Sequence, residues 1–274
     1  MSAPVRGLAR SPLSAALAAA RAENRAALIG YLPVGFPDVA LSIDAMRAMV
    51  AGGVDVVEVG VPYSDPGMDG PVIQRAVEPA VRAGVSMADA LRAVAAVAEA
   101  GAAAVVMSYW NPIERYGIPR LAADLAAAGG SGLITPDLLP EEGGGWISAA
   151  EQYHLDRVFL LAPSSTDARI ASTMAACRGF VYAASTMGVT GARAAVGGAA
   201  RALVARARAA DPELPVCVGL GVSDADQAAE VAAFADGVIV GSAFVRRLLD
   251  SPDTAGVAAV GALASELAEG VRRR

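Results

Sequence analysis

Lysine is absent from the sequence: all 22 basic residues of the 274-residue chain are arginines. A Schiff base with a substrate or with pyridoxal phosphate forms on a lysine amine, so this chemistry is excluded on this chain. There is one histidine, His154, and the two cysteines, Cys177 and Cys217, lie in no short spacing typical of a zinc site. Isolated cysteines favour a reducing, cytoplasmic compartment over a disulfide framework.

Aromatic residues and clustered charges are scarce as well. Aromatics make up 5% of the chain although 55% of it is hydrophobic, so the core must be built mainly from Ala, Val and Leu. The net charge is −6 and the basic run is confined to residues 272–274, which argues against a nucleic-acid surface. The Ala-rich region 93–107 is broken by Glu99 and Gly101 and is too short for a membrane span.

What the chain does contain is an alternation of short apolar runs and Ala-rich segments. Eight runs are predicted to be strands: 27–33, 54–62, 102–109, 132–138, 157–163, 179–185, 215–221 and 236–242. Helices are predicted between several of them because Asp, Ser or Gly residues precede the segments and several end in Gly: 41–53 behind Asp38, 87–101 behind Ser86, 118–130 behind Gly117, and 225–235 behind Ser223.

This alternation predicts an α/β fold. Strands that are apolar on both faces and separated by helices pair in parallel, with helices covering the sheet. Eight such units match a single (β/α)₈ TIM barrel; a doubly wound sheet is the alternative, but no G-x-G-x-x-G follows the first strand. We expect one domain over 1–274, with the barrel over 26–270. Ser11 and Pro12 predict a helix in the extension 1–25 rather than a signal peptide.

A glutamate interrupts the second predicted strand. Side chains alternate between the two faces of a strand, so Val57 and Val59 should face the helices while Glu58 points to the barrel axis. Glu58 lies near the carboxyl end of its strand, where active sites of this fold sit, and burial there should raise its pKa. It is a candidate general acid–base, or else a structural glutamate bonded to backbone donors or an arginine.

The loop that follows, YSDPGMDGP, contains a second carboxylate, Asp69. Its neighbours are typical turn residues, so the loop alone leaves Asp69 open between a turn cap and a functional group. Because the loop leaves the strand that carries Glu58, it can fold over the barrel mouth and bring both carboxylates to one substrate.

Glycine motifs end the last two predicted strands. VGLGVS contains Gly219 and Gly221, and VGSAF contains Gly241 and Ser242. The loops after strands seven and eight, with helix N-termini nearby, hold phosphate in many TIM barrels, and backbone N–H groups do this without lysine. After the sixth strand, the small-residue-rich stretch 185–198 has the composition of a mobile loop over the mouth.

Six segments then carry a family pattern, in this order: VEVGVPYSDPGMDGPVIQ, PDLLPEE, FLLAPSST, FVYAASTMGVTGAR, GLGVS and VGSAF. Together they strongly resemble the α subunit of tryptophan synthase over nearly the whole chain, and the first segment is the most specific. The resemblance implies retro-aldol cleavage of indole-3-glycerol phosphate to indole and glyceraldehyde 3-phosphate.

The resemblance also implies roles for single residues. Glu58 matches the glutamate that moves protons, and Asp69 matches the carboxylate that accepts the indole N–H bond. Substrate-binding positions are implied at Tyr182, Thr190 (which orients Asp69), Tyr31, Tyr109 and Ile73. Phosphate-binding positions are implied at Gly191, Gly219, Gly221, Gly241 and Ser242. Neither a metal nor a cofactor is expected on this chain.

The family works as an α₂β₂ heterotetramer whose β subunit carries pyridoxal phosphate and receives indole through a tunnel. A β subunit is therefore the expected partner, and the absence of lysine agrees with a cofactor on that partner. Two alternatives stay open: a free-standing lyase without a partner, and an inactive homologue that activates or scaffolds one. Retention of Glu58 and Asp69 counts against the inactive homologue.

Overall fold

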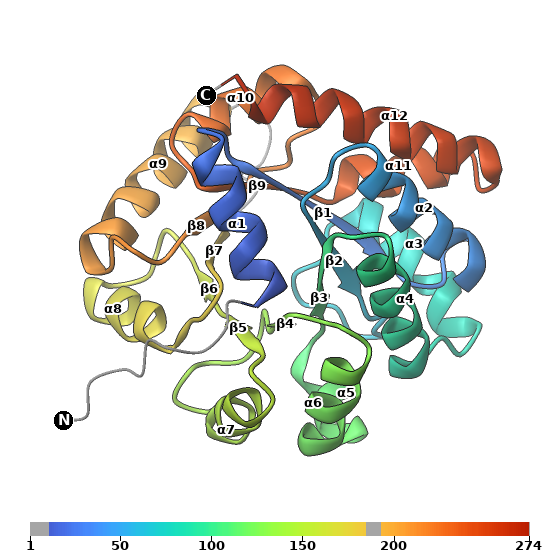
Figure 1. Ribbon diagram of the computed structural model, residues 1–274, viewed down its shortest axis with the longest axis horizontal. Coiled ribbons are helices and arrows are strands. Elements are labelled where there is room, and N and C mark those ends of the chain that lie inside the picture. Colours follow the sequence, from blue (N-terminus) through green and yellow to red (C-terminus); the bar gives the residue numbers. More distant parts are fainter. Residues whose placement is uncertain (1–10, 185–192, 274) are drawn as a thin grey trace.

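The computed structural model describes residues 11–184 and 193–273. Parallel strands form a ring, and helices surround it (Figure 1). The strands are β1 (Ala27–Pro33), β2 (Val56–Gly60), β3 (Ala103–Met107), β4 (Gly132–Ile134), β5 (Asp156–Val158), β6 (Leu160–Leu161), β7 (Val181–Ala184), β8 (Val216–Gly219) and β9 (Gly237–Val240). The predicted TIM barrel is confirmed.

The helices fill the connections between these strands. They are α1 (Pro12–Ala22), α2 (Val39–Ala51), α3 (Pro71–Arg82), α4 (Met87–Glu99), α5 (Trp110–Tyr116), α6 (Ile118–Ala127), α7 (Gly144–Gln152), α8 (Asp167–Ala176), α9 (Arg193–Ala210), α10 (Ala225–Ala232), α11 (Ser242–Asp250) and α12 (Thr254–Val271). Among the helices of the described ranges, none combines the length and apolar character needed to cross a bilayer.

The predicted fifth strand, 157–163, is divided in two at Phe159, which corrects the count from eight strands to nine. β5 pairs with β4, whereas β6 pairs with β7, so the partner changes at this residue. The Phe159 carbonyl accepts a hydrogen bond from the Tyr182 N–H at 3.1 Å. Strands of a closed barrel are staggered, so one strand reaches its two neighbours at different heights. The segment from β5 to β6 therefore closes the ring.

Local capping explains where several helices begin. Ser11 accepts a hydrogen bond from the Ser14 N–H at 3.0 Å and Pro12 follows it, as predicted for α1. Asp38 caps α2 by accepting from the Leu41 N–H at 2.8 Å. The cap of α10 is Asp224 rather than Ser223, because the Asp224 carboxylate reaches the N–H of the third helical residue.

The predicted loop over 185–198 ends earlier than expected. Residues 185–192 lie outside the described residues, and α9 already begins at Arg193. The Ala- and Arg-rich sequence of α9 has enough helix propensity to outweigh Gly197 and Gly198 within it.

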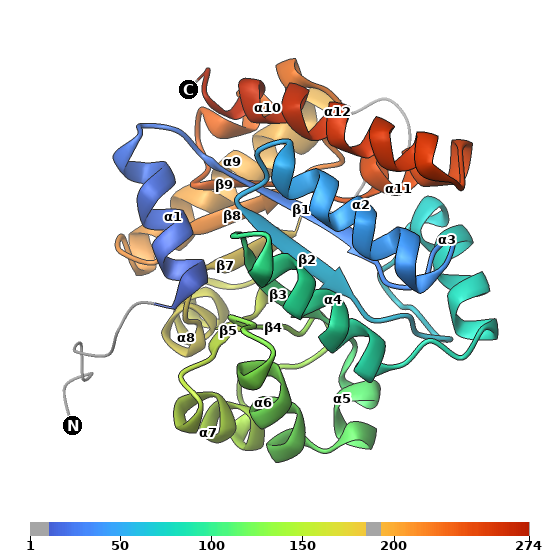
Figure 2. The same ribbon diagram turned by 45° about the vertical axis from the view of Figure 1, so that its right-hand side comes forward.

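Two apolar layers make the core. The outer layer lies between strands and helices and includes Val57 and Val59. The inner layer fills the barrel with inward side chains such as Ile29, Val56 and Val105, and Leu13, Leu17 and Ala20 of α1 belong to it. Helix α1 thus closes the end where the strands begin, which Figures 1 and 2 show from two directions. The carboxyl ends of the strands remain for a site.

Candidate active site

Glu58 is the centre of the candidate site. Its strand β2 pairs with β1 and β3, and Glu58 lies opposite Tyr31 on one side and Val105 on the other. Because Val57 and Val59 belong to the outer core layer, the alternation of side chains directs Glu58 inward. The predicted orientation of this side chain is confirmed.

The Glu58 carboxyl group is buried inside the barrel. The residue is 1% exposed, and its Oε1 atom has no partner among the described residues. Burial raises the pKa of Glu58 from 4.5 to about 8. At neutral pH the carboxyl group therefore holds a proton that it can donate, and it becomes a base once it has done so.

Two tyrosines line the interior beside Glu58. Burial, and after it the charges of Asp69 and Glu58, raises the pKa of Tyr31 well above its ordinary value. Burial, followed by the charge of Glu58, does the same for the pKa of Tyr182. Tyr31 and Tyr182 come from β1 and β7, so they flank Glu58 from separate parts of the ring. These two of the three predicted substrate-binding tyrosines thus lie at the site.

Asp69 lies in the loop between β2 and α3, where it is half-buried. The Tyr109 hydroxyl donates a hydrogen bond to Asp69 Oδ1 at 3.2 Å and accepts one from the Met68 N–H at 2.9 Å. Burial raises the pKa of Asp69, and the hydrogen bond from Tyr109 opposes that rise. The loop is therefore tied to the segment between β3 and α5, and the charges of Asp69 and Glu58 both act on Tyr31.

Part of this arrangement was not predicted from the sequence. Tyr109 was expected in an indole pocket but without its hydrogen bond to Asp69, and Tyr63, whose ring lies 5.4 Å from that of Tyr109, was not singled out. Thr190, expected to orient Asp69, lies outside the described residues, as does Gly191. Ile73 lies in the first turn of α3, half-buried against the outer core.

The four remaining predicted phosphate residues gather at the ends of β8 and β9, which are neighbouring strands. Gly219 ends β8, and Gly221 has a φ of +67°, a conformation that favours glycine. Gly241 and Ser242 begin α11, whose N-terminus has no side-chain cap. The first N–H groups of a helix lack intrahelical partners, so this N-terminus can bind an anion.

Close packing against the tyrosines leaves little room for a side chain at two of these glycines. A Cβ atom on Gly219 would lie 2.7 Å from the Tyr182 hydroxyl, and one on Gly241 would lie 3.3 Å from Cδ1 of Tyr31. Helix α10 is different, because Asp224 already caps it. The structure therefore favours α11, rather than α10, as the helix whose N-terminus faces an anionic group.

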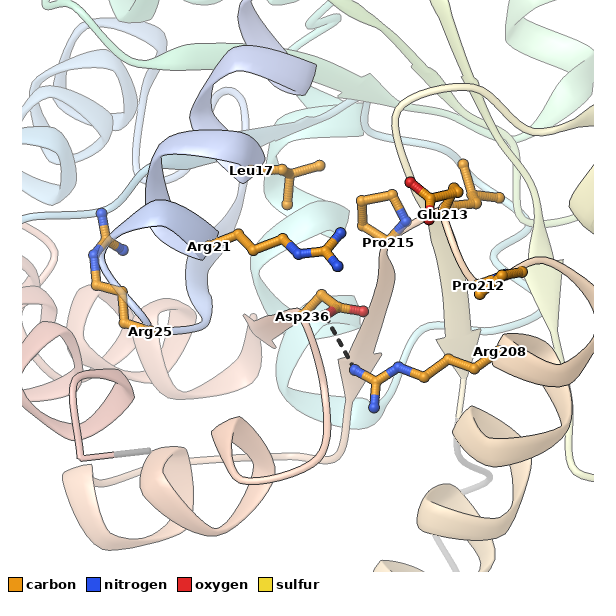
Figure 3. A pocket seen from close by; sticks show the side chains of 9 residues that line it. Leu17, Arg21, Arg25, Arg208, Pro212, Glu213, Pro215 and Asp236 are labelled. Atoms are coloured by element: carbon orange, nitrogen blue, oxygen red, sulfur yellow. Dashed lines mark hydrogen bonds and ion pairs between the residues drawn. The ribbon is translucent and has the colours of Figure 1, made fainter.

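A cavity of about 260 Å³ opens at the opposite end of the barrel, between α1 and the starts of β8 and β9. Figure 3 shows Arg21 and Arg208 pointing toward Asp236 there. Arg208 Nη2 donates to Asp236 Oδ1 at 3.0 Å, and Asp236 Oδ2 accepts from the Val216 N–H at 3.0 Å. This is the amino end of the strands, where TIM barrels place stabilising rather than catalytic groups. The cavity is thus not the candidate active site.

The fold and the site together are those of a TIM-barrel enzyme with paired carboxylates at the carboxyl ends of its strands. In the described part of the chain, no cluster of three or more His, Cys, Asp or Glu residues could hold a metal ion. The family model described as tryptophan synthase alpha chain matches residues 17–272, so the chain belongs to that family. Members of this family are alpha subunits of tryptophan synthase, and the alpha subunit is a lyase that acts in tryptophan synthesis.

Individual relatives support the same family assignment. The chain is 64% identical to the tryptophan synthase alpha chain of Thermobifida fusca over 259 residues, which covers 93% of this chain and 96% of that protein. It is 61% identical to that of Mycobacterium marinum over 254 residues, covering 93% and 92%. A crystal structure of tryptophan synthase from M. tuberculosis matches with a TM-score of 0.88 at 55% identity, covering 96% of this chain and 99% of that chain.

Proposed function

We propose that this chain cleaves indole-3-glycerol phosphate to indole and glyceraldehyde 3-phosphate by acid–base catalysis. The observation that carries the proposal is the buried carboxyl group of Glu58, whose Oε1 atom has no partner among the described residues, in a chain of this family. A retro-aldol cleavage without a Schiff base must move one proton from the glycerol hydroxyl to indole C3. A single carboxyl group with a pKa of about 8 can carry it.

The protonated Glu58 carboxyl group first donates its proton to indole C3. This leaves positive charge on the ring, centred on the indole nitrogen. The Glu58 carboxylate then accepts the proton of the glycerol hydroxyl next to C3. The C–C bond breaks, its electron pair returns to the ring, and the hydroxyl carbon becomes the aldehyde. Glu58 ends in the protonated form in which it began, so the step balances.

Asp69 stabilises the positive charge that develops between these two transfers. Its carboxylate accepts a hydrogen bond from the indole N–H, and Tyr109 holds that carboxylate in place. Because Tyr109 donates to the charged form of Asp69, its hydrogen bond opposes the rise in the pKa of Asp69 that burial causes.

The substrate phosphate binds at the N-terminus of α11. Gly241 and Ser242 present backbone N–H groups there, and the adjoining Gly219 and Gly221 leave room for the phosphate oxygens. Gly191 and Thr190 join the site by the family resemblance. Tyr31, Tyr182, Tyr109 and Ile73 enclose the indole and glycerol parts.

In this proposal the product indole passes to a β subunit in an α₂β₂ complex, and pyridoxal phosphate belongs to that subunit. The absence of lysine from this chain supports the division. Two free cysteines, Cys177 and Cys217, support a cytoplasmic location.

The experiment is an assay of indole release from indole-3-glycerol phosphate by the isolated chain, with and without added β subunit. We expect slow release alone and strong activation by the β subunit. Full activity without it would instead identify a free-standing lyase. No release under either condition, from a folded chain, would contradict the proposed reaction and leave an inactive activator or scaffold.

A further inference from the structure

The Glu58 carboxylate needs a hydrogen-bond donor that the reaction described above does not supply. During the reaction Glu58 becomes charged while it is buried, and its Oε1 atom has no partner among the described residues. A buried carboxylate without a donor is strongly disfavoured. A nearby hydroxyl group could provide one at the moment when the charge forms.

Few groups inside the barrel can act as that donor. The titratable side chains that feel the charge of Glu58 are Tyr31 on β1, Tyr182 on β7 and Cys217 on β8. Asp69 and Tyr109 approach Tyr31 from the loops after β2 and β3. The other inward positions are apolar, and they include Ile29, Val56, Val105, Ile134, Val158 and Ile239.

Register favours Tyr31 over Tyr182. Strand β1 adjoins β2, and Tyr31 lies directly opposite Glu58. Strand β7 is separated from β2 by β8, β9 and β1. Cys217 is also remote from β2 along the sheet, and a thiol is a weak donor.

The position of the Tyr31 ring supports the same choice. A Cβ atom on Gly60 would lie 2.6 Å from the Tyr31 hydroxyl oxygen, so this hydroxyl lies against Gly60. Gly60 follows Glu58 on the same inward face of β2. The Tyr182 hydroxyl lies instead against Gly219 of β8. The Tyr31 hydroxyl has no hydrogen bond of its own among the described residues, so it is available.

We propose that Tyr31 is a positioning residue for Glu58, whose hydroxyl donates a hydrogen bond to the Glu58 carboxylate when that carboxylate forms. The role of Tyr31 in the reaction rests on the proposed function, whereas the hydrogen bond between Tyr31 and the Glu58 carboxylate does not. The phenol remains a donor throughout, because burial and the two carboxylates keep it protonated. The missing side chain of Gly60 provides the space in which the hydroxyl sits.

The test replaces Tyr31 by Phe, which removes one oxygen atom, and titrates the Glu58 carboxyl carbon by NMR in the folded chain. Loss of a donor to the charged form raises a carboxyl pKa, so we expect the Glu58 midpoint to rise by about one pH unit. The control Tyr116→Phe removes a hydroxyl that bonds Asp124 outside the barrel, and should leave the midpoint unchanged. The titration needs no substrate, so its failure is separate from failure of the proposed function.

The same variants are then compared by the pH dependence of indole release. Activity of the native chain should fall above about pH 8, as Glu58 loses its proton. In Tyr31→Phe this fall should move to higher pH by about one unit, while kcat at pH 7 drops about fivefold and KM changes little. Gly60→Ala leaves the Tyr31 hydroxyl in the protein but moves it away from Glu58, so the fall in activity should again shift to higher pH. An unchanged profile in Tyr31→Phe, or a shift in Tyr182→Phe instead, would overturn the inference.

Discussion

Asp55 directly precedes β2 and Glu58 lies within it, yet the surroundings of these two carboxylates are opposite. Asp55 accepts hydrogen bonds from Arg25 Nη1 at 2.7 Å, Arg25 Nη2 at 2.8 Å and the Leu28 N–H at 2.8 Å. Glu58 has an oxygen with no partner among the described residues. The carboxylate at the amino end of the barrel is therefore paired with a cation, whereas the carboxyl group toward the carboxyl end keeps an oxygen without a partner among the described residues.

Asp156 extends this comparison to a carboxylate that is as deeply buried as Glu58. Asp156 accepts a hydrogen bond from Ser11 and forms an ion pair with Arg178 at 3.2 Å. Burial raises the pKa of Asp156 to about 6 against the opposing effects of Ser11 and Arg178, whereas burial raises the pKa of Glu58 to about 8. The amino end of the barrel pairs its charges and holds α1 in place, and the carboxyl end leaves one carboxyl group free for chemistry.

The sharpest contrast should come from Glu58→Gln. Loss of the proton carrier is expected to lower kcat about 1000-fold, a size typical of general acid–base groups. The folded state binds a proton that the unfolded state releases between pH 4.5 and about 8, so stability of the native chain falls as pH rises through this range. The Gln variant escapes that loss, which is on the order of 4 kcal/mol at pH 8.

Kinetic assays and denaturant unfolding at pH 5 and pH 8 measure the two effects. If the variant lost activity and also lost stability at pH 8, Glu58 would be a structural residue like Asp55.

Removing an arginine from the amino end of the barrel should lower stability and leave activity unchanged, which is the opposite of the result expected for Glu58→Gln. Arg25→Ala leaves the half-buried Asp55 carboxylate without its arginine partner and should reduce the free energy of unfolding by about 3 kcal/mol. Arg21→Ala is the matched control, because Arg21 lines the same cavity but forms no ion pair among the described residues. Activity per folded molecule should stay near the native level in both variants, as measured by urea unfolding and indole release.

Asp69→Asn tests the second carboxylate. Removal of the negative charge should lower kcat/KM about 100-fold, the size expected when one group that stabilises transition-state charge is lost. The exposed carboxylate of Asp44, changed to Asn on the outer helix α2, serves as the control. Equal rates for native chain and Asp69→Asn would mean that the Tyr109 hydrogen bond makes Asp69 a loop anchor only.

Gly241→Asp tests the anion site at the start of α11. A carboxylate among the N–H groups repels phosphate, so KM should rise about tenfold or more with a smaller change in kcat. Gly198→Asp, on the exposed side of α9 where a side chain meets open space, should leave KM unchanged. A native KM for Gly241→Asp would place the phosphate elsewhere.

The smallest effect is expected from Ser11→Ala, which removes the cap of α1 and the hydrogen bond to Asp156. Such a cap contributes about 1 kcal/mol, so the thermal midpoint should fall by a few degrees while kcat is unchanged. Ser172→Ala, which removes an exposed hydroxyl from α8, is the control. A loss of activity in Ser11→Ala would show that the two ends of the barrel are coupled.

Features governed by local sequence could be predicted. The inward direction of Glu58 followed from the alternation of strand residues, and α1 and α2 followed from Ser11 and Asp38 as caps. The division at Phe159 could not be predicted, because it depends on the stagger of strands that are remote in sequence.

Contacts between loops were equally out of reach. The bond from Tyr109 to Asp69, and the fit of Tyr31 against Gly60 and Gly241, join residues from different strands. The sequence showed which residue types were available for a site, and the barrel determined which of them meet.

The role of Glu58 as proton donor can be tested directly by an NMR titration of its carboxyl carbon in the folded native chain, assigned by the absence of this signal in Glu58→Gln. We expect a midpoint near pH 8, since burial disfavours the charged form of the carboxyl group. A midpoint near the ordinary value of 4.5 would contradict it. Glu58 would then be a paired or hydrated carboxylate, and it could not be the proton donor at neutral pH.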